Sequence, residues 1–236
     1  MHIDRPPNSQ QVFQEDRSRL KHGFRLAGLF SLAVLFVFIV QWLFAQPLLA
    51  FGVQPREWVG LSGVVLMPLL HSGWPHLLSN LPPLFMMSLA LFWLFPTAAW
   101  RVLAAAWLVP PALVWLFAAS GTTHVGASGL TFALFGFLAL SGLVRMQGPA
   151  LAISLLTLFY YGGMLSGLVP DTPGISWQAH VAGVLTGVVL AVVFRKSDRP
   201  PVRVYDWELD EDPELDDLET DGSDSSFGMP ESGHRH

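Results

Sequence analysis

The sequence predicts an all-α polytopic membrane protein with six transmembrane helices. Of its 236 residues, 52% are hydrophobic and only 13% are charged, whereas a soluble domain is usually about 25% charged. The charges are also segregated, because few of them interrupt the long stretch between Arg25 and Arg195. We therefore expect a hydrophobic membrane core with polar ends.

Six apolar segments approach the length of about 20 residues that a transmembrane helix needs. They are residues 24–45, 76–96, 100–119, 127–145, 149–168 and 178–195. A shorter apolar segment, 59–70, runs into the His-Ser-Gly-Trp-Pro sequence of residues 71–75, and we expect it to be a loop in the outer membrane interface. Pro82 and Pro83 should kink or break the second helix.

Polar segments divide the chain into three parts. Residues 1–22 are a polar cytoplasmic arm, residues 23–197 are the six-span core, and residues 198–236 are an acidic tail. Carboxylates crowd the tail from Asp206 to Asp224, so it cannot bury enough apolar surface to fold alone. We expect a solvated, disordered cytoplasmic tail; docking to a partner protein is the second interpretation.

Ser128 and His180 lie at the mouths of two apolar segments. Ser128 belongs to the Gly-Ala-Ser-Gly sequence that starts at Gly126. Polar residues at membrane depth are costly without a partner, which makes both residues functional candidates. Together they suit a nucleophile and its general base. The plainer interpretations are a serine that caps a helix and a histidine that faces lipid headgroups. A second Gly-x-Ser-Gly sequence makes Ser62 a competing nucleophile.

Two further groups of residues have helical spacing. His76 and Asn80 are four residues apart, so they share a helix face, and both can donate hydrogen bonds to a developing oxyanion. Alternatively, they bond neighbouring helices. His180, Gly183 and Gly187 also share a face, and the two glycines permit close packing against another helix. If that helix is the segment beginning near Ser128, the two candidate residues meet.

Missing residue types exclude several chemistries. The chain has no cysteine, which excludes disulfides and thiolate metal sites, and it lacks the His-Glu-x-x-His motif of zinc proteases. No carboxylate lies inside a predicted span. This absence argues against an aspartyl dyad, an Asp-oriented triad and a proton-relay pump. A Ser–His dyad remains, with no metal or cofactor.

The order of these motifs resembles that of the rhomboid family of intramembrane serine proteases. His-x-x-x-Asn, Gly-x-Ser-Gly and Ala-His-x-x-Gly-x-x-x-Gly follow one another over about residues 55–195. The resemblance implies that Ser128 is the nucleophile, that His180 is the general base, and that His76, Asn80 and the Ser128 N–H form the oxyanion site. It favours Ser128 over Ser62, because the family nucleophile follows the His-x-x-x-Asn motif and Ser62 precedes it.

The resemblance also implies supporting residues, and the sequence departs from the family pattern at two places. The supporting positions are Gly126 and Gly129 beside the serine, His71 upstream of the His-x-x-x-Asn motif, Phe132 against the histidine, and the packing glycines Gly183 and Gly187. Some family members have a tyrosine where this chain has Phe132, which can stack but cannot donate a hydrogen bond. The Trp-Arg pair common in the first outer loop is missing, and Arg56-Glu57-Trp58 is only a loose substitute.

The resemblance implies partners and a location as well. The substrates would be single-span membrane proteins with a small residue before the scissile bond, and the lipid bilayer would be the other partner, with no nucleic acid. The location would be the cytoplasmic (inner) membrane of a bacterium, with the active site opening to the outer side. The alternative functions are a catalytically inactive relative that binds membrane clients and, third, a small-molecule transporter.

The basic residues predict the orientation of the chain. Six spans put both termini on one side, and of the 13 Lys and Arg residues only Arg56 falls on the other side. The positive-inside rule makes the basic side cytoplasmic. Reporter fusions at the C-terminus and after Arg145 should therefore read cytoplasmic, and a fusion near Thr172 should read external. An external C-terminus would contradict the six-span prediction.

Overall fold

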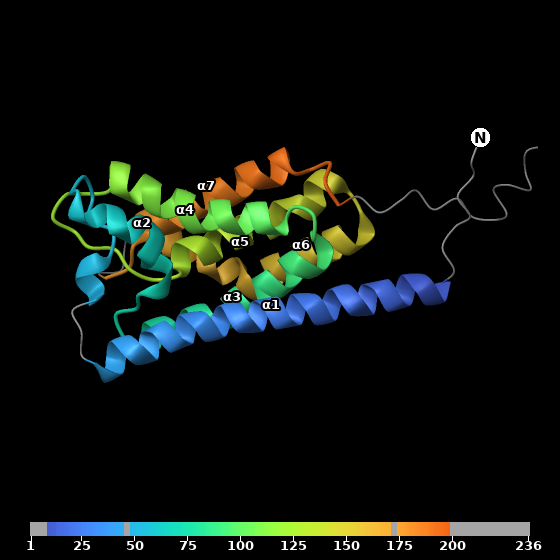
Figure 1. Ribbon diagram of the computed structural model, residues 1–236. Coiled ribbons are helices and arrows are strands. Elements are labelled where there is room, and N and C mark those ends of the chain that lie inside the picture. The colour runs from blue at the N-terminus through green and yellow to red at the C-terminus, as the bar shows by residue number, and fades with distance from the viewer. Residues whose placement is uncertain (1–8, 45–47, 171–173, 199–236) are drawn as a thin grey trace, which may run out of the picture. The chain divides into compact units, whose positions relative to one another are not determined.

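The computed structural model describes residues 9–44, 48–170 and 174–198, so the predicted tail from residue 199 onward lies outside this part (Figure 1). The described part contains helices and no β-strand. Its α-helices are α1 (Ser9–Leu43), α2 (Ser62–Leu66), α3 (Trp74–Leu94), α4 (Ala99–Phe117), α5 (Ser128–Arg145), α6 (Gly148–Tyr161) and α7 (Trp177–Val193). Its 3₁₀ segments are η1 (Leu48–Phe51), η2 (Val59–Leu61), η3 (Met67–Leu69) and η4 (Gly162–Leu168). The predicted all-α class is confirmed.

Five helical stretches in the described part are long and apolar enough to cross a membrane: α1, α3, α4, α5, and α6 together with η4. The sixth predicted span forms α7, which is also apolar but has only 17 residues. At 1.5 Å per residue this helix is about 25 Å long, at the short end of the range for a transmembrane helix. The protein is therefore an integral membrane helical bundle.

The first helix is much longer than one span. α1 has 35 residues and begins at Ser9, so most of the predicted polar arm is helical and continuous with the first span. Side chains 13–22 are exposed, and Gly23 is the first buried residue, packed against the backbone of Leu89 and Trp93 in α3. The beginning of α1 therefore projects past the rest of the bundle (Figure 1).

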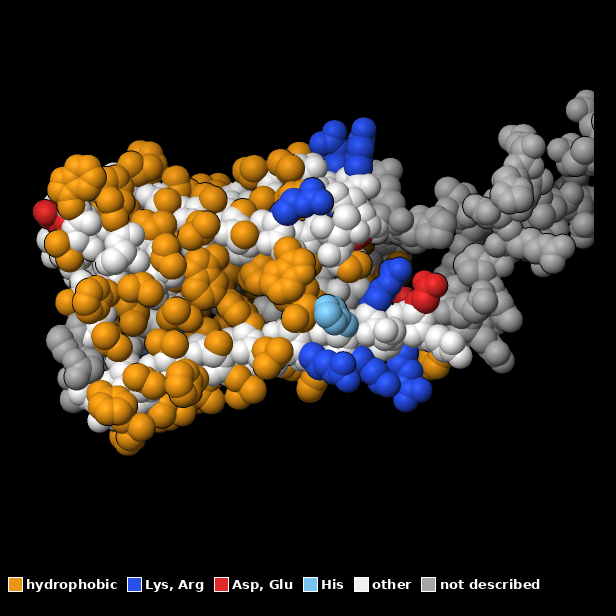
Figure 2. Space-filling model, viewed as in Figure 1, with side chains coloured by type: hydrophobic (Ala, Val, Ile, Leu, Met, Phe, Trp, Pro, Cys, Tyr) orange, Lys and Arg blue, Asp and Glu red, His pale blue; other side chains and the backbone are white. Residues whose placement is uncertain are grey.

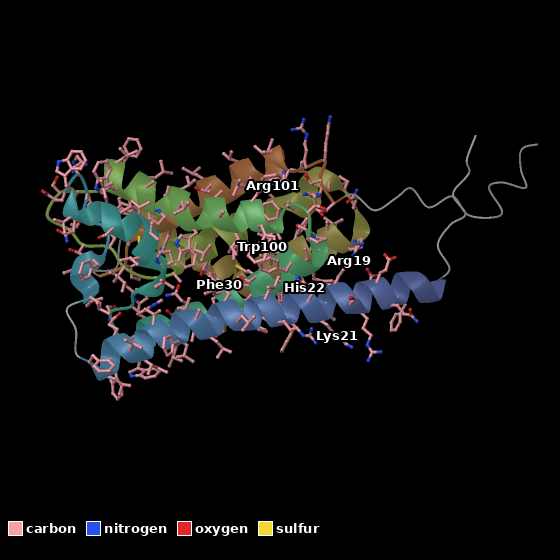
Figure 3. The ribbon with its side chains drawn as sticks, viewed as in Figure 1. Arg19, Lys21, His22, Phe30, Trp100 and Arg101 are labelled. Atoms are coloured by element: carbon pink, nitrogen blue, oxygen red, sulfur yellow. The ribbon has the colours of Figure 1, made fainter. Side chains whose placement is uncertain are left out.

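Basic side chains gather at the end of the bundle where α1 begins, and hydrophobic side chains cover most of the remaining visible face (Figure 2). Figure 3 labels Arg19 and Lys21 of α1 and Arg101 of α4, which lie toward this end. The uneven distribution of basic residues along the sequence thus becomes an uneven distribution in the structure, with basic side chains gathered at one end of the bundle.

Two local features differ from the sequence-based expectation. Segment 59–70, expected as a loop, forms the short helical turns η2, α2 and η3. Its glycines explain this compact form, because Gly60 and Gly63 press against the backbone of Gln54 and Val53 with no room for a Cβ. Helix α3 also continues through Pro82 and Pro83 without a break, as membrane helices often do when neighbouring groups satisfy the freed carbonyls.

Helix α5 is the centre of the bundle. Most of its side chains are buried, whereas α1 and α6 expose most of theirs. Helix α7 makes the most extensive contact with α5, and α6, α4 and α3 also pack against it. A hydrophobic helix buried on nearly all sides is the most rigid support that the bundle offers.

Glycines bring α5 and α7 unusually close together. A Cβ added to Gly183 would lie 2.3 Å from the carbonyl oxygen of Gly129, and one added to Gly187 would lie 2.0 Å from that of Ala133. From the α5 side, a Cβ on Gly136 would lie 2.7 Å from the Val184 carbonyl oxygen. Only glycine fits at these contacts, so the small-xxx-small pair of α7 works as a packing motif.

Two charged residues fix the chain just after α7. Arg145, the last residue of α5, donates hydrogen bonds to the backbone carbonyls of Phe194, at 2.6 Å, and Ser197. Asp198 accepts a 2.7 Å hydrogen bond from the N–H of Thr97, beside the start of α4. This end of α7 is therefore tied to both α4 and α5.

The glycine contact predicts a contrast between two glycine substitutions. Gly187→Ala should lower the free energy of unfolding by about 1–3 kcal/mol, because the added methyl group must push α7 away from α5. Gly28→Ala, in α1, should leave it unchanged or raise it by about 1 kcal/mol, since nothing lies within 4 Å of the new Cβ. Thermal unfolding in detergent measures both, and equal stability of the two variants would contradict the packing interpretation.

Candidate active site

The nucleophile candidate lies at the start of the central helix. Ser128 is the first residue of α5 and is partly exposed. Gly126, two residues before it, has a φ of 115°, a conformation that favours glycine. The first N–H groups of a helix have no partners within that helix, so those at the start of α5 are available to an anion beside Ser128. The positive end of the helix dipole points to the same place.

The base candidate is held in a defined orientation. His180 Nδ1 lies 2.8 Å from the carbonyl oxygen of Gly167. Because a carbonyl can only accept, Nδ1 must carry the proton, and in the neutral ring Nε2 then presents a lone pair. Phe132 stacks on the same ring with centroids 4.1 Å and planes 11° apart. The ring is thus fixed by an edge contact and a face contact, with Nε2 left as an acceptor.

The glycine contact between α5 and α7 joins the helix starts that carry Ser128 and His180. A Cβ on Gly129, the residue after the serine, would lie 3.3 Å from the carbonyl oxygen of Ala179, the residue before the histidine. Ser128 Oγ and His180 Nε2, which both belong to the described residues, are not hydrogen-bonded to each other. Catalytic hydrogen bonds are often long without substrate and shorten in the reacting complex, so the arrangement still suits a nucleophile and a base.

His76 lies against the loop that leads to Ser128. Its Nε2 is 2.5 Å from the position where a Cβ on Gly126 would stand, so only glycine fits there. Its Nδ1 lies 3.0 Å from Ser72 Oγ. When the Ser72 hydroxyl donates to Nδ1, Nε2 carries the ring proton and is a donor beside the loop that precedes Ser128. This geometry suits an oxyanion donor.

Asn80 is less directly placed than His76. Its side chain is buried, and its Nδ2 donates a 2.8 Å hydrogen bond to the carbonyl oxygen of His76, one turn earlier in α3. An amide nitrogen has two N–H groups, so one remains after this bond. Asn80 therefore supports the backbone that carries His76 and retains one donor.

His71 links the same loop to helix α1. Its Nε2 accepts a 3.3 Å hydrogen bond from the N–H of Ala127, immediately before the serine. The backbone of His71 is in turn held by Gln41 of α1, whose Nε2 donates to the His71 carbonyl at 2.7 Å and whose Oε1 accepts from the His71 N–H at 3.4 Å. Sequence reasoning missed Gln41. A lone amide in an apolar span was the available signal.

The competing serine belongs to a different environment. Ser62 lies at the start of α2, and its hydroxyl donates a 2.9 Å hydrogen bond to the carbonyl oxygen of Val59 in the preceding turn. The glycine after it, Gly63, packs against the backbone of Val53. This copy of Gly-x-Ser-Gly therefore has a packing function.

One known family and several known proteins resemble this chain. The family model described as "Rhomboid domain" matches residues 55–197. Uncharacterized proteins of Mycobacterium tuberculosis and Mycobacterium bovis are each 38% identical over 160 residues, which cover 63% of this chain and 65% of theirs. One of Mycobacterium leprae is 33% identical over 147 residues, 59% of this chain and 58% of its own. The chain thus spans less than two thirds of these relatives.

The buried state of His71 predicts a pH dependence of stability. Burial, with a smaller effect of neighbouring His76, lowers the pKa of His71 from 6.5 to about 4. The folded protein therefore keeps His71 neutral where the unfolded chain would protonate it. Its stabilising contribution is complete above about pH 6.5 and is lost as the pH falls toward about 4. The loss amounts to at most about 3 kcal/mol.

Thermal unfolding in detergent between about pH 7.5 and about pH 4.5 tests this dependence. His71→Gln, which keeps an acceptor for the Ala127 N–H but cannot take up a proton, should lose less stability over the same range. An identical slope in the two proteins would show that other groups cause the acid sensitivity.

Proposed function

This chain belongs to the rhomboid family, and on that premise we propose that it is an intramembrane serine endopeptidase with Ser128 as nucleophile and His180 as general base. The observation that carries the proposal is the hydrogen bond from His180 Nδ1 to the Gly167 carbonyl. It selects the tautomer whose Nε2 can accept the proton of a serine hydroxyl. A buried carboxylate normally performs this orienting function in a catalytic triad, and here a backbone carbonyl takes its place.

The reaction follows from the positions of these groups. As the Ser128 oxygen attacks a peptide carbonyl carbon, its proton passes to His180 Nε2, and a tetrahedral intermediate forms. The negative oxygen is stabilised by the Ser128 N–H, His76 and the remaining N–H of Asn80. Collapse of the intermediate releases the amine, which takes the proton from His180, and leaves an acyl ester on Ser128. A water molecule, deprotonated by His180, then attacks that ester, and as the acid product leaves, the proton on His180 returns to the Ser128 oxygen.

The substrate class rests on the family. We propose single-span membrane proteins with a small residue before the scissile bond and a helix-weakening stretch nearby. A spanning helix engages its carbonyls in its own hydrogen bonds, so the substrate must unwind locally before Ser128 can attack. We also propose that the protein is bacterial and that the site opens to the outer side of the membrane. The basic residues of the sequence support the cytoplasmic side for both termini.

A non-catalytic client-binding protein is the alternative. It would use the same bundle but would not need a histidine tautomer with a free acceptor beside a serine, so the Gly167 contact favours the protease. A small-molecule transporter, the third possibility, is disfavoured because the predicted spans contain no carboxylate.

Four substitutions test the proposed roles. Ser128→Ala and His180→Ala should abolish cleavage of a model transmembrane substrate, because no replacement nucleophile or base is available. His76→Ala should lose about 10²–10³ in rate, the usual effect of removing one oxyanion donor. Asn80→Ala should be impaired but active, because the backbone donors at the start of α5 remain. Turnover is measured at matched expression and thermal stability.

Ser62→Ala is the matched control, since it removes the serine of the second Gly-x-Ser-Gly sequence and should keep most activity. Labelling by a fluorophosphonate probe should likewise disappear in Ser128→Ala and persist in Ser62→Ala. The reverse pattern would reassign the nucleophile. Cleavage by both Ser128→Ala and Ser62→Ala at the wild-type rate would contradict the proposed function.

A further inference from the structure

His124, in the loop between α4 and α5, has all four of its polar groups hydrogen-bonded. Its backbone N–H and C=O pair with the C=O and N–H of Val53, each at 2.9 Å. Its ring Nε2 lies 2.8 Å from Thr122 Oγ1, and its ring Nδ1 lies 2.7 Å from Ser176 Oγ. The residue is only 7% exposed. Neither the dyad nor the oxyanion site uses it.

The direction of these hydrogen bonds can be worked out. Thr122 donates its single hydroxyl proton to the carbonyl oxygen of Ala119, at 2.6 Å, so it must accept from His124 Nε2–H. A neutral imidazole carries one N–H, so His124 Nδ1 must accept from the hydroxyl of Ser176. Burial lowers the pKa of His124, which favours this neutral form. One directed chain therefore runs from Ser176 through His124 to Ala119.

Ser176 connects this chain to the base candidate. It is the residue immediately before α7, and its carbonyl oxygen accepts hydrogen bonds from the N–H groups of Ala179, at 3.0 Å, and His180, at 3.2 Å. The first turn of α7, which carries His180, is thus built on a residue whose side chain is held by His124. On the other side, His124 lies four residues before Ser128, in the loop that leads to α5.

We propose that His124 is a positioning residue, which ties the start of α7 to the loop before Ser128 and so sets the separation of nucleophile and base. This inference rests on the proposed function. The opposite end of α7 is already fixed through Arg145 and Asp198, and the glycine contact fixes its middle. The His124 chain supplies the remaining restraint at the end where the chemistry takes place.

The effect should fall on the reaction step rather than on substrate binding. A misplacement of about 1 Å can reduce a rate about 10²-fold, and here the Gly167 and Phe132 contacts still hold the His180 ring. We therefore expect His124→Phe, which keeps an aromatic ring but loses both ring hydrogen bonds, to reduce kcat about ten- to hundredfold. KM should stay within about twofold, because His124 does not contact substrate in this proposal.

Ser176→Ala removes one hydrogen bond of the chain without disturbing the buried ring, and so tests the same proposal if His124→Phe folds poorly. It should show the same loss in kcat, and the double variant should be no slower than the single ones, because residues that act through one chain are not additive. Ser176→Thr, which keeps the hydroxyl, should restore turnover. Thr123→Val, in the same loop but outside the chain, is the control and should match the wild type.

A second measurement does not depend on proteolysis. Magnetic resonance of isotope-labelled histidine in the full-length protein reports which ring nitrogen carries the proton. His124 should show a protonated Nε2, and Ser176→Ala should shift the ring signals of His180, whereas Thr123→Val should not. If the wild type cleaves no substrate and so does not differ from Ser128→Ala, the proposed function is wrong. The ring signals of His124 and His180 would still test whether His124 holds the start of α7. Wild-type kcat together with unchanged His180 signals in Ser176→Ala would overturn the inference.

Discussion

The missing Cβ atoms of Gly183 and Gly187 set the geometry on which the candidate site depends. Helices in lipid gain little from burying apolar surface against each other, so close packing and hydrogen bonds must hold them together. These glycines let α7 approach α5 until backbone meets backbone. Ser128 begins α5 and His180 lies in the first turn of α7, and the same contact that joins the helices also brings their neighbours Gly129 and Ala179 together.

Hydrogen bonds with a fixed direction then define what each histidine can do. His71 accepts from the N–H of Ala127, His180 donates to the carbonyl of Gly167, and His124 does both with hydroxyl partners. An unpaired polar group in a low-dielectric interior is expensive, so such pairing is expected at this depth. This pairing also has a chemical effect, because each partner determines which ring nitrogen retains a lone pair.

The sequence was sufficient for the features that depend on residue type and spacing. The six apolar segments, the shared face of His180, Gly183 and Gly187, and the residues of the candidate dyad could all be read from it. The partners of those residues could not. Gly167 acts through a backbone carbonyl, which leaves no side-chain signal, and Gln41 acts on His71 across 30 residues of chain. Such pairings depend on how the helices pack, which spacing alone does not determine.

Helix boundaries were the other weak point, for a related reason. Pro82 and Pro83 oppose helix formation locally, yet α3 continues through them, because in a membrane the alternative is backbone exposed to lipid. The polarity of residues 9–22 suggested an arm, yet α1 simply extends through them. Local preference is overridden in both cases.

Helix α1 lies entirely before residue 55, where the match to the rhomboid domain begins. Nevertheless Gln41 of this helix holds the backbone of His71, and His71 holds the loop before Ser128. The working unit of this protein is therefore larger than the domain it shares with its family. The candidate serine and part of its support therefore come from different stretches of chain, so a substitution in α1 can shift the loop before Ser128 while every motif residue stays the same.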